Sequence, residues 1–124
     1  MTMRALVIED EPALQVFYQR VLQKANYTVD IASDGQQALL SLSGFDAPHL
    51  IILDMRLPDT NGIEVLNYIT KQEHLQNTCV LVATAGAEYE RYTHAVPTAE
   101  FLLKPVRPTQ ILEIAEREVQ RHMA

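Results

Sequence analysis

The sequence predicts an α/β fold of three layers, in which helices cover both faces of a five-stranded parallel sheet. Short apolar runs alternate with segments whose apolar residues recur at helical spacing, so the expected order is βαβαβαβαβα. The apolar runs are continuous rather than alternating, which is typical of strands buried on both faces. Such an order requires right-handed crossovers, and a common strand order for a doubly wound five-stranded sheet is 2-1-3-4-5.

Five segments are expected to form the strands. The clearest are the apolar runs 5–8, 49–53 and 78–83, and weaker candidates are 28–32 and 101–103. The single cysteine, Cys79, falls within one of these runs and is expected to be buried. In a doubly wound sheet the ligand crevice lies at the carboxyl ends of the strands, where the strand order reverses. Polar residues that directly follow the strands are therefore the candidates for a functional site.

Residues with special backbone preferences mark the ends of the expected helices. The helices are expected to begin near Pro12, Asp34, Asn61, Glu88 and Pro108. Asn26 is a plausible left-handed end of the first helix, and Gly44 ends the second near Leu42. Pro97 should stop the fourth helix, because proline lacks a backbone N–H.

Size and composition narrow the classes of protein. The 124 residues, 48% of them hydrophobic, fit one domain spanning residues 1–124. A net charge of −6 and the lack of any Lys/Arg run argue against direct nucleic-acid binding. The first apolar run is too short for a signal peptide or a membrane span, so a cytoplasmic protein that does not bind membranes is expected. The sequence contains no glycine-rich phosphate loop, so no nucleotide cofactor is expected. The four histidines lack the spacing of metal ligands.

Reactive side chains follow four of the five expected strands. Glu9 and Asp10 come after the first, Asp54 after the third, Thr84 after the fourth and Lys104 after the fifth. Because the carboxyl ends of parallel strands share one edge of a sheet, we expect these residues to meet in one crevice. Such a meeting of carboxylates, a hydroxyl and a lysine would rarely arise by chance.

Each of these residue types has a chemical use in such a crevice. Clustered carboxylates repel one another, and a hard divalent cation such as Mg²⁺ or Mn²⁺ relieves that repulsion. The carboxylate of Asp54 is a competent nucleophile for forming an aspartyl phosphate. Lys104 can neutralise charge on a transferring phosphoryl group, and the Thr84 hydroxyl can donate to one of its oxygens.

Four stretches of the chain carry a family resemblance. They are 6–12 (LVIEDEP), 53–62 (LDMRLPDTNG), 83–85 (ATA) and 101–105 (FLLKP). In this order and at these spacings they resemble the motifs of the response-regulator receiver domain of two-component signalling. The resemblance spans essentially the whole chain and implies a flavodoxin-like fold similar to that of the chemotaxis regulators.

The resemblance implies a role for each residue of the constellation. Asp54 would be the phosphoacceptor, Thr84 the switch hydroxyl, Phe101 the switch aromatic and Lys104 the lysine that contacts phosphate. The peptide bond between Lys104 and Pro105 would be cis, which proline makes affordable.

The resemblance also implies a metal site. Mg²⁺, or Mn²⁺, would be held by Glu9, Asp10, Asp54 and the backbone carbonyl of Arg56. Asp10 would ligate the ion directly, and Glu9 would act mainly through water.

The function implied is phosphorylation-dependent signalling. A histidine kinase or phosphotransfer domain would supply the phosphoryl group, and a downstream protein or attached output domain would respond. The domain would promote its own phosphorylation chemistry without being an enzyme that turns over a substrate. One alternative is a pseudo-receiver, an interaction module that never carries phosphate. Two further alternatives lack a feature that they require. A haloacid-dehalogenase-type phosphohydrolase needs a second Asp at the position of Arg56, and a flavodoxin-like cofactor binder needs a phosphate-binding loop that the sequence does not contain.

Two features depart from the family pattern. The segment between Thr84 and Lys104 is shorter than is common, and residues 96–99 (VPTA) replace the familiar Gly-Ala-Asp. A short or irregular fourth helix is therefore expected, and with it a monomer or a dimer through an unusual face. Arg56 lies two residues beyond Asp54, a position that borders the phosphoryl group in receivers.

Overall fold

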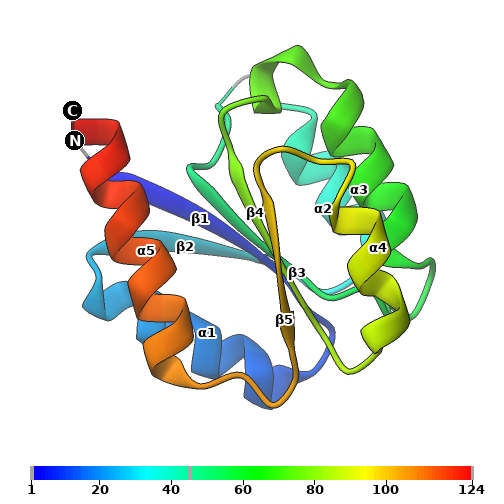
Figure 1. The fold of residues 1–124 in the computed structure, drawn as a ribbon, viewed down its shortest axis with the longest axis horizontal. Helices are drawn as coiled ribbons and strands as arrows, with labels where there is room; N and C mark the ends of the chain where they lie inside the picture. The colour runs from blue at the N-terminus through cyan, green and yellow to red at the C-terminus, as the bar shows by residue number, and fades with distance from the viewer. Residues whose placement is uncertain (1, 45, 124) are drawn as a thin grey trace.

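The computed structural model describes residues 2–44 and 46–123, and they form one sheet between two layers of helices (Figure 1). The strands are β1 (Met3–Ile8), β2 (Tyr27–Ala32), β3 (Leu50–Leu53), β4 (Cys79–Thr84) and β5 (Ala99–Leu103). All neighbouring strands pair in parallel, in the order β2-β1-β3-β4-β5. The predicted fold class and strand order are confirmed.

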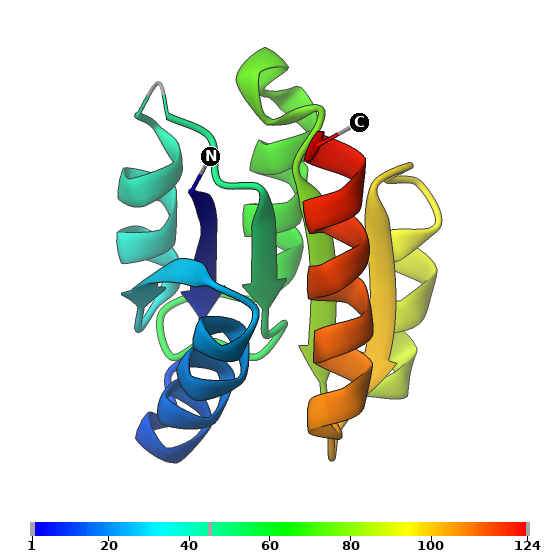
Figure 2. The same ribbon diagram turned by 90° about the vertical axis from the view of Figure 1, so that its left-hand side faces the viewer.

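Five α-helices alternate with these strands. They are α1 (Pro12–Lys24), α2 (Gly35–Leu42), α3 (Gly62–Lys71), α4 (Glu90–Thr93) and α5 (Pro108–Met123), with 3₁₀ turns η1 (Glu73–Leu75) and η2 (Ala87–Tyr89). Helices α1 and α5 cover one face of the sheet, and α2, α3 and α4 cover the other (Figure 2). None of the helices in the part of the chain that the structure describes is long and apolar enough to cross a membrane.

Burial on both faces explains the continuous apolar strands. In β1, Ala5 and Val7 pack beneath α1 and α5, whereas Leu6 and Ile8 pack toward α2 and α3. Every residue of β4 is buried, including Cys79 as predicted. Strand β5 forms one edge of the sheet and is only partly buried, which explains its weaker signal in the sequence.

Local signals place most helix ends as expected. The Asp34 side chain accepts a hydrogen bond from Gln37 N (2.7 Å) at the start of α2, and Asn61 caps α3 in the same way. Asn26 has a φ of 66°, the left-handed conformation expected after the first helix.

The segment before β5 differs in detail from the prediction. The expected fourth helix from Glu88 is instead the 3₁₀ turn η2 followed by the four residues of α4, which confirms a short, irregular helix. The helix ends at Thr93, whose hydroxyl donates to the carbonyl of Glu90 (2.7 Å). Pro97 lies beyond this end, so the prediction that Pro97 stops the helix is wrong. Strand β5 begins at Ala99, not at residue 101, because pairing with β4 requires backbone groups rather than apolar side chains.

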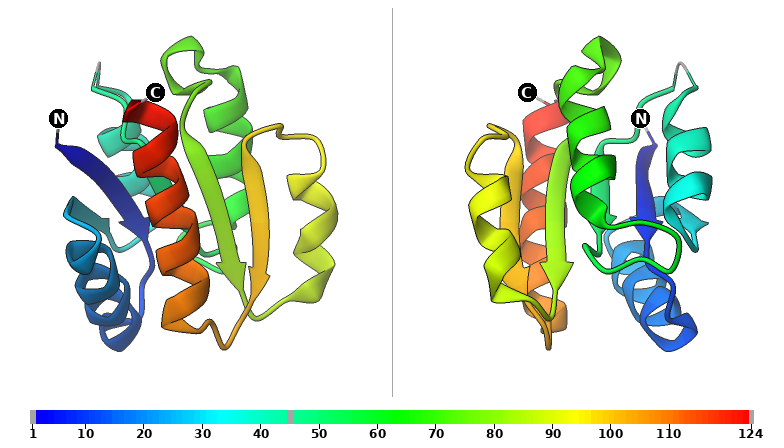
Figure 3. Two further views of the ribbon diagram at one scale, coloured as in Figure 1. Left: turned by 60° about the vertical axis from the view of Figure 1, so that its left-hand side comes forward. Right: turned by 90° about the vertical axis from the view of Figure 1, so that its right-hand side faces the viewer.

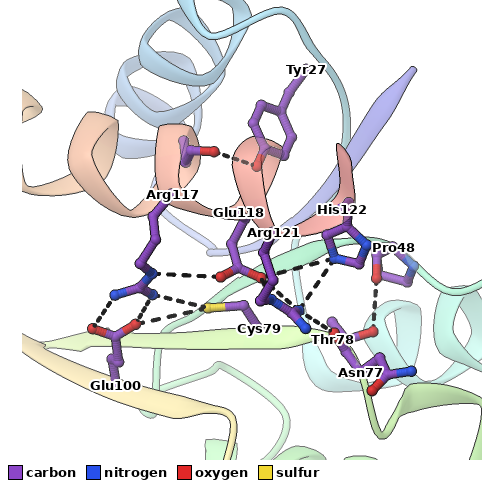
Figure 4. Close-up of polar contacts among 11 residues, drawn as sticks. Tyr27, Pro48, Asn77, Thr78, Cys79, Glu100, Arg117, Glu118, Arg121 and His122 are labelled. Atoms are coloured by element: carbon purple, nitrogen blue, oxygen red, sulfur yellow. Dashed lines mark hydrogen bonds and ion pairs between the residues drawn. The ribbon is translucent and has the colours of Figure 1, made fainter. Parts of the chain in front are cut away.

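A polar cluster joins α5 to the amino-terminal ends of β4 and β5 (Figure 4). Arg117 forms an ion pair with Glu100 and lies 3.6 Å from the buried carboxylate of Glu118. Arg121 donates to Glu118 Oε1 through Nε (2.9 Å) and Nη2 (2.7 Å), and Nη2 also donates to Asn77 O (2.6 Å). The positive charges of two arginines therefore balance the negative charges of two glutamates at this end of the sheet. We call this cluster the clamp, because it links α5 to β4 and β5.

Candidate functional site

The strands end at the side of the sheet away from the clamp, where their arrowheads point downward in Figure 3. Reactive side chains meet at these carboxyl ends. Lys104 Nζ donates hydrogen bonds to Glu9 Oε1 (2.8 Å) and to Asp54 Oδ2 (3.0 Å). One ammonium group therefore joins residues that follow β1, β3 and β5. Thr84 is the last residue of β4 and therefore lies at the same carboxyl end of the sheet.

Backbone hydrogen bonds that continue the sheet hold these residues in place. Asp54 N donates to Ile8 O (3.0 Å), and Lys104 N donates to Thr84 O (2.9 Å). The peptide bond between Lys104 and Pro105 is cis, as predicted. The ends of the strands thus set the positions of the residues that carry the reactive side chains.

The site buries two carboxylates beside one ammonium. Glu9 is 1% exposed and Asp54 is 6% exposed. Burial raises the pKa of Glu9, and the nearby charge of Asp54 adds to that rise, although the hydrogen bond from Lys104 opposes it. Burial lowers the pKa of Lys104, but its bonds to both carboxylates outweigh burial and leave that pKa raised. Lys104 is therefore held in its charged form.

Three carboxylates are close enough to share a cation. Glu9, Asp10 and Asp54 each offer an oxygen, and these oxygens all lie within 4.8 Å of one another. Asp10 is exposed, so this group is open to solvent on one side. Hard oxygen donors with room for water suit Mg²⁺ or Mn²⁺, and the residues present fit such an ion. The part of the backbone carbonyl of Arg56 in such a site stays a prediction.

Thr84 and Phe101 differ in how directly they relate to the site. Thr84 is fully buried, and its Oγ1 has no hydrogen-bond partner among residues 2–44 and 46–123. An unsatisfied buried hydroxyl costs free energy, so an acceptor that enters the crevice would be stabilised there. Phe101 is partly buried on β5, opposite Val82 of β4, and packs on the α3 side of the sheet. Its role as a switch aromatic stays a prediction.

Asp59, for which no role was predicted, organises the loop after β3. The Asp59 carboxylate accepts hydrogen bonds from Gly35 N (2.8 Å) and Gln36 N (2.9 Å) at the start of α2. These bonds, the one from Gly35 first, lower the pKa of Asp59. A Cβ on Gly35 would lie 2.2 Å from Thr60 Cγ2, so only glycine allows this approach. In the sequence, the only indication of this role was an acidic residue between Pro58 and Asn61.

Two polar residues of α1, Gln15 and Tyr18, also lie near the site without having been predicted there. Gln15 Nε2 donates to Glu9 O (2.6 Å) and to Ser33 Oγ (3.1 Å), which ties the start of α1 to the loop after β2. Tyr18 is 1% exposed, and its hydroxyl finds no partner in the described part of the chain. Burial raises the pKa of Tyr18 to about 12, although nearby Lys104 opposes the rise. A tyrosine among the apolar positions of this helix was the available signal.

Comparison with protein families gives one match over most of the chain. The model of the response regulator receiver domain matches residues 5–116. These residues contain every member of the candidate site.

Curated proteins similar to this chain include regulators of gene expression. The chain is 30% identical over 112 residues to the alkaline phosphatase synthesis transcriptional regulatory protein PhoP of Bacillus subtilis, a match that covers 90% of this chain and 46% of PhoP. It is 31% identical over 117 residues to protein CcdB of the same species, covering 92% of this chain and 95% of CcdB. The chain thus spans less than half the length of PhoP and nearly all of CcdB.

Solved structures similar to this one include a chemotaxis response regulator and a receiver domain of a sensor kinase. The chemotaxis response regulator CheY4 of Vibrio cholerae has a TM-score of 0.84 and 26% identity, over 95% of this chain and 99% of that chain. The receiver domain of the sensor histidine kinase PA1611 from Pseudomonas aeruginosa has a TM-score of 0.84 and 24% identity, over 97% and 99%. That structure holds a magnesium ion coordinated in its active site cleft.

Proposed function

The chain belongs to the response regulator receiver domain family, and on that premise we propose that it accepts a phosphoryl group on Asp54. The observation that carries the proposal is the contact of one partly buried ammonium, Lys104 Nζ, with the buried carboxylates of both Glu9 and Asp54. The phosphoryl donor is a phosphohistidine of a histidine kinase or phosphotransfer domain. The domain acts in the cytoplasm as a signalling module, and it neither turns over a substrate nor binds nucleic acid itself.

The transfer is a displacement at phosphorus. A carboxylate oxygen of Asp54 forms a bond to phosphorus as the P–N bond of phosphohistidine breaks, and the electron pair of that bond stays on the imidazole nitrogen. Arg56 N donates to Asp54 Oδ1 (3.1 Å) and Lys104 donates to Oδ2, so both oxygens are oriented before reaction. Lys104 then faces the phosphoryl oxygens and offsets their charge.

A divalent cation fits the acidic side of this site. Asp10 would ligate the ion directly together with Asp54 and the carbonyl of Arg56, and Glu9 would hold it mainly through water. When bound, Mg²⁺ supplies positive charge that stabilises the transferring phosphoryl oxygens. The buried Glu9 carboxylate also keeps Lys104 charged when the ion is absent.

Signalling follows from the unsatisfied hydroxyl of Thr84. A phosphoryl oxygen on Asp54 offers Thr84 Oγ1 the acceptor that it lacks among the described residues. Movement of Thr84 toward that oxygen frees space that Phe101 can fill, which changes the α4–β5 surface presented to a downstream protein. A phosphate-independent pseudo-receiver would have no need of this complete set of reactive side chains.

Acetyl phosphate with Mg²⁺ tests the proposal directly. Intact-mass spectrometry should detect one acid-stable, base-labile phosphoryl group in the wild-type protein and none in Asp54→Asn. Asp30→Asn is the matched control, because Asp30 is exposed and lies on β2, away from the site. A phosphoryl group that remains in Asp54→Asn, or that maps to Ser33 or Thr84, would overturn the assignment.

A further inference from the structure

An ion pair spans the two loops that flank Asp54 and Thr84. Arg56 Nη2, in the loop after β3, lies 3.2 Å from Glu88 Oε1, in the turn after β4. The side chains of Arg56 and Glu88 are 57% and 61% exposed, so the pair lies at the outer surface of the crevice. Because β3 and β4 are neighbours in the sheet, this contact joins the segments that carry the proposed phosphoacceptor and the proposed switch hydroxyl.

Arg56 is tethered directly to the phosphoacceptor. Its backbone N–H donates to Asp54 Oδ1 (3.1 Å), so the guanidinium belongs to the residue in hydrogen-bond contact with the reacting carboxylate. In this structure the guanidinium is engaged by Glu88 instead of by Asp54. A guanidinium that left Glu88 and turned toward Asp54 would add positive charge beside the reacting carboxylate.

Gly86 makes room for the carboxylate of Glu88. A Cβ on Gly86 would lie 2.6 Å from Glu88 Oε1 and 2.8 Å from the Tyr89 ring, closer than atoms can approach. The Glu88 side chain thus folds back over Gly86 to reach Arg56. Its own backbone N–H, and then Arg56, hold the pKa of Glu88 below its usual value, so the carboxylate is charged.

We propose that Glu88 is a positioning residue that holds the Arg56 guanidinium away from Asp54, and that a phosphoryl group on Asp54 takes Arg56 from Glu88. This inference rests on the proposed function. A phosphoryl group carries more charge than a carboxylate and accepts bidentate hydrogen bonds from arginine, so it is the stronger partner. When the Arg56 guanidinium leaves Glu88, the Glu88 side chain and the turn η2 that precedes α4 lose their link to the loop after β3. The pair is then an electrostatic clasp between the phosphorylation site and the segment before α4.

The size of the effect follows from the exposure of the pair. Exposed ion pairs are weak, so freeing Arg56 should change the affinity for an anionic phosphodonor by about two- to fivefold. The change should appear in the concentration of acetyl phosphate that half-saturates phosphorylation. The limiting rate should change less, because Lys104 and the residues around Asp54 stay in place.

A double-mutant cycle on the full chain tests the clasp. With acetyl phosphate and Mg²⁺, Glu88→Gln should lower the half-saturating concentration about two- to fivefold, and Arg56→Gln should raise it. Adding Glu88→Gln to Arg56→Gln should have no further effect. Glu90→Gln is the matched control, since it removes the same charge from an exposed position on α4 and should leave the value unchanged. Gly86→Ala should act in the same direction as Glu88→Gln, because the new methyl group displaces the Glu88 carboxylate.

Each result decides between distinct conclusions. If Glu88→Gln has the same effect with and without Arg56, or if Glu90→Gln matches it, the effect is general surface charge and the clasp is rejected. In that case phosphorylation of the wild type at Asp54 still upholds the proposed function. If the wild type takes up no phosphoryl group at Asp54, both proposals are rejected.

Discussion

Replacing Lys104 with methionine should destabilise the metal-free protein strongly. Methionine keeps the apolar stem but removes the ammonium that donates to Glu9 (2.8 Å) and Asp54 (3.0 Å). Both carboxylates are buried, so the variant leaves two negative charges in the site with no cation between them.

The expected cost is about 3 kcal/mol in the free energy of unfolding near neutral pH. Removing one partner of a buried ion pair costs about 3–5 kcal/mol, and the lower end applies because the Lys104 side chain is 17% exposed and water can enter. The cost should shrink as pH falls. Burial raises the pKa of Glu9 above its ordinary value of 4.5, and loss of Lys104 raises it further. A raised pKa penalises the folded state as pH rises from the ordinary value of 4.5 through the raised pKa, and the penalty vanishes at lower pH, where Glu9 is protonated in both states.

Urea denaturation in the presence of EDTA, at about pH 7 and about pH 5, measures this cost. Lys71→Met is the matched control, because Lys71 is exposed at the end of α3 and its loss should cost less than about 1 kcal/mol. Mg²⁺ should restore part of the lost stability, since a cation can replace the ammonium. If Lys104→Met unfolds at the same urea concentration as Lys71→Met, then the ammonium of Lys104 does not stabilise the folded protein and the reasoning is wrong.

Three further predictions concern the metal, the clamp and the assembly. Mg²⁺ should raise the Tm of the wild type, and Asp10→Asn should reduce that rise by removing the exposed ligand; an unchanged Tm in the wild type would argue against the site. Arg121→Met should lower the free energy of unfolding by about 1–3 kcal/mol, because it removes two hydrogen bonds from the buried Glu118, and denaturation at matched conditions would check this. With a beryllofluoride mimic the protein should not dimerise through α4, β5 and α5, since α4 has four residues and Glu100 is paired within its own chain. Sedimentation that detects a mimic-induced dimer, lost in a variant of the exposed Leu103, would contradict this.

Local patterns in the sequence were sufficient for the architecture. The apolar runs ending at Ile8 and Leu53 predicted buried strands because helices cover both faces of such a strand, which favours apolar residues at successive positions. The order of strands and helices then left few topologies, and the sheet order agrees with the commonest of them. The weaker prediction for β5 reflects its place at an edge, where polar residues such as Glu100 are tolerated.

Much of the candidate site was also predictable, because the carboxyl ends of parallel strands must meet. Asp54 and Lys104 lie far apart in the chain, yet strand polarity predicted that they would meet in one crevice, and the structure places Lys104 Nζ 3.0 Å from Asp54 Oδ2. The roles of Thr84 and Phe101 came from the resemblance, since nothing in spacing distinguishes a switch residue from a core residue.

Only the tertiary structure determined which charged side chains form ion pairs with one another. The sequence offers Arg56 many acids, but only the folded loops bring Glu88 within 3.2 Å and leave space over Gly86 for its carboxylate. Likewise α5 places Glu118 beneath two arginines and buries it, although a glutamate in an amphipathic helix is usually exposed. Periodicity indicates which face of an element is buried, because the residues of one face recur at the period of that helix or strand. Ion pairs depend on side-chain reach across loops and layers, and that distance exists only once the chain has folded.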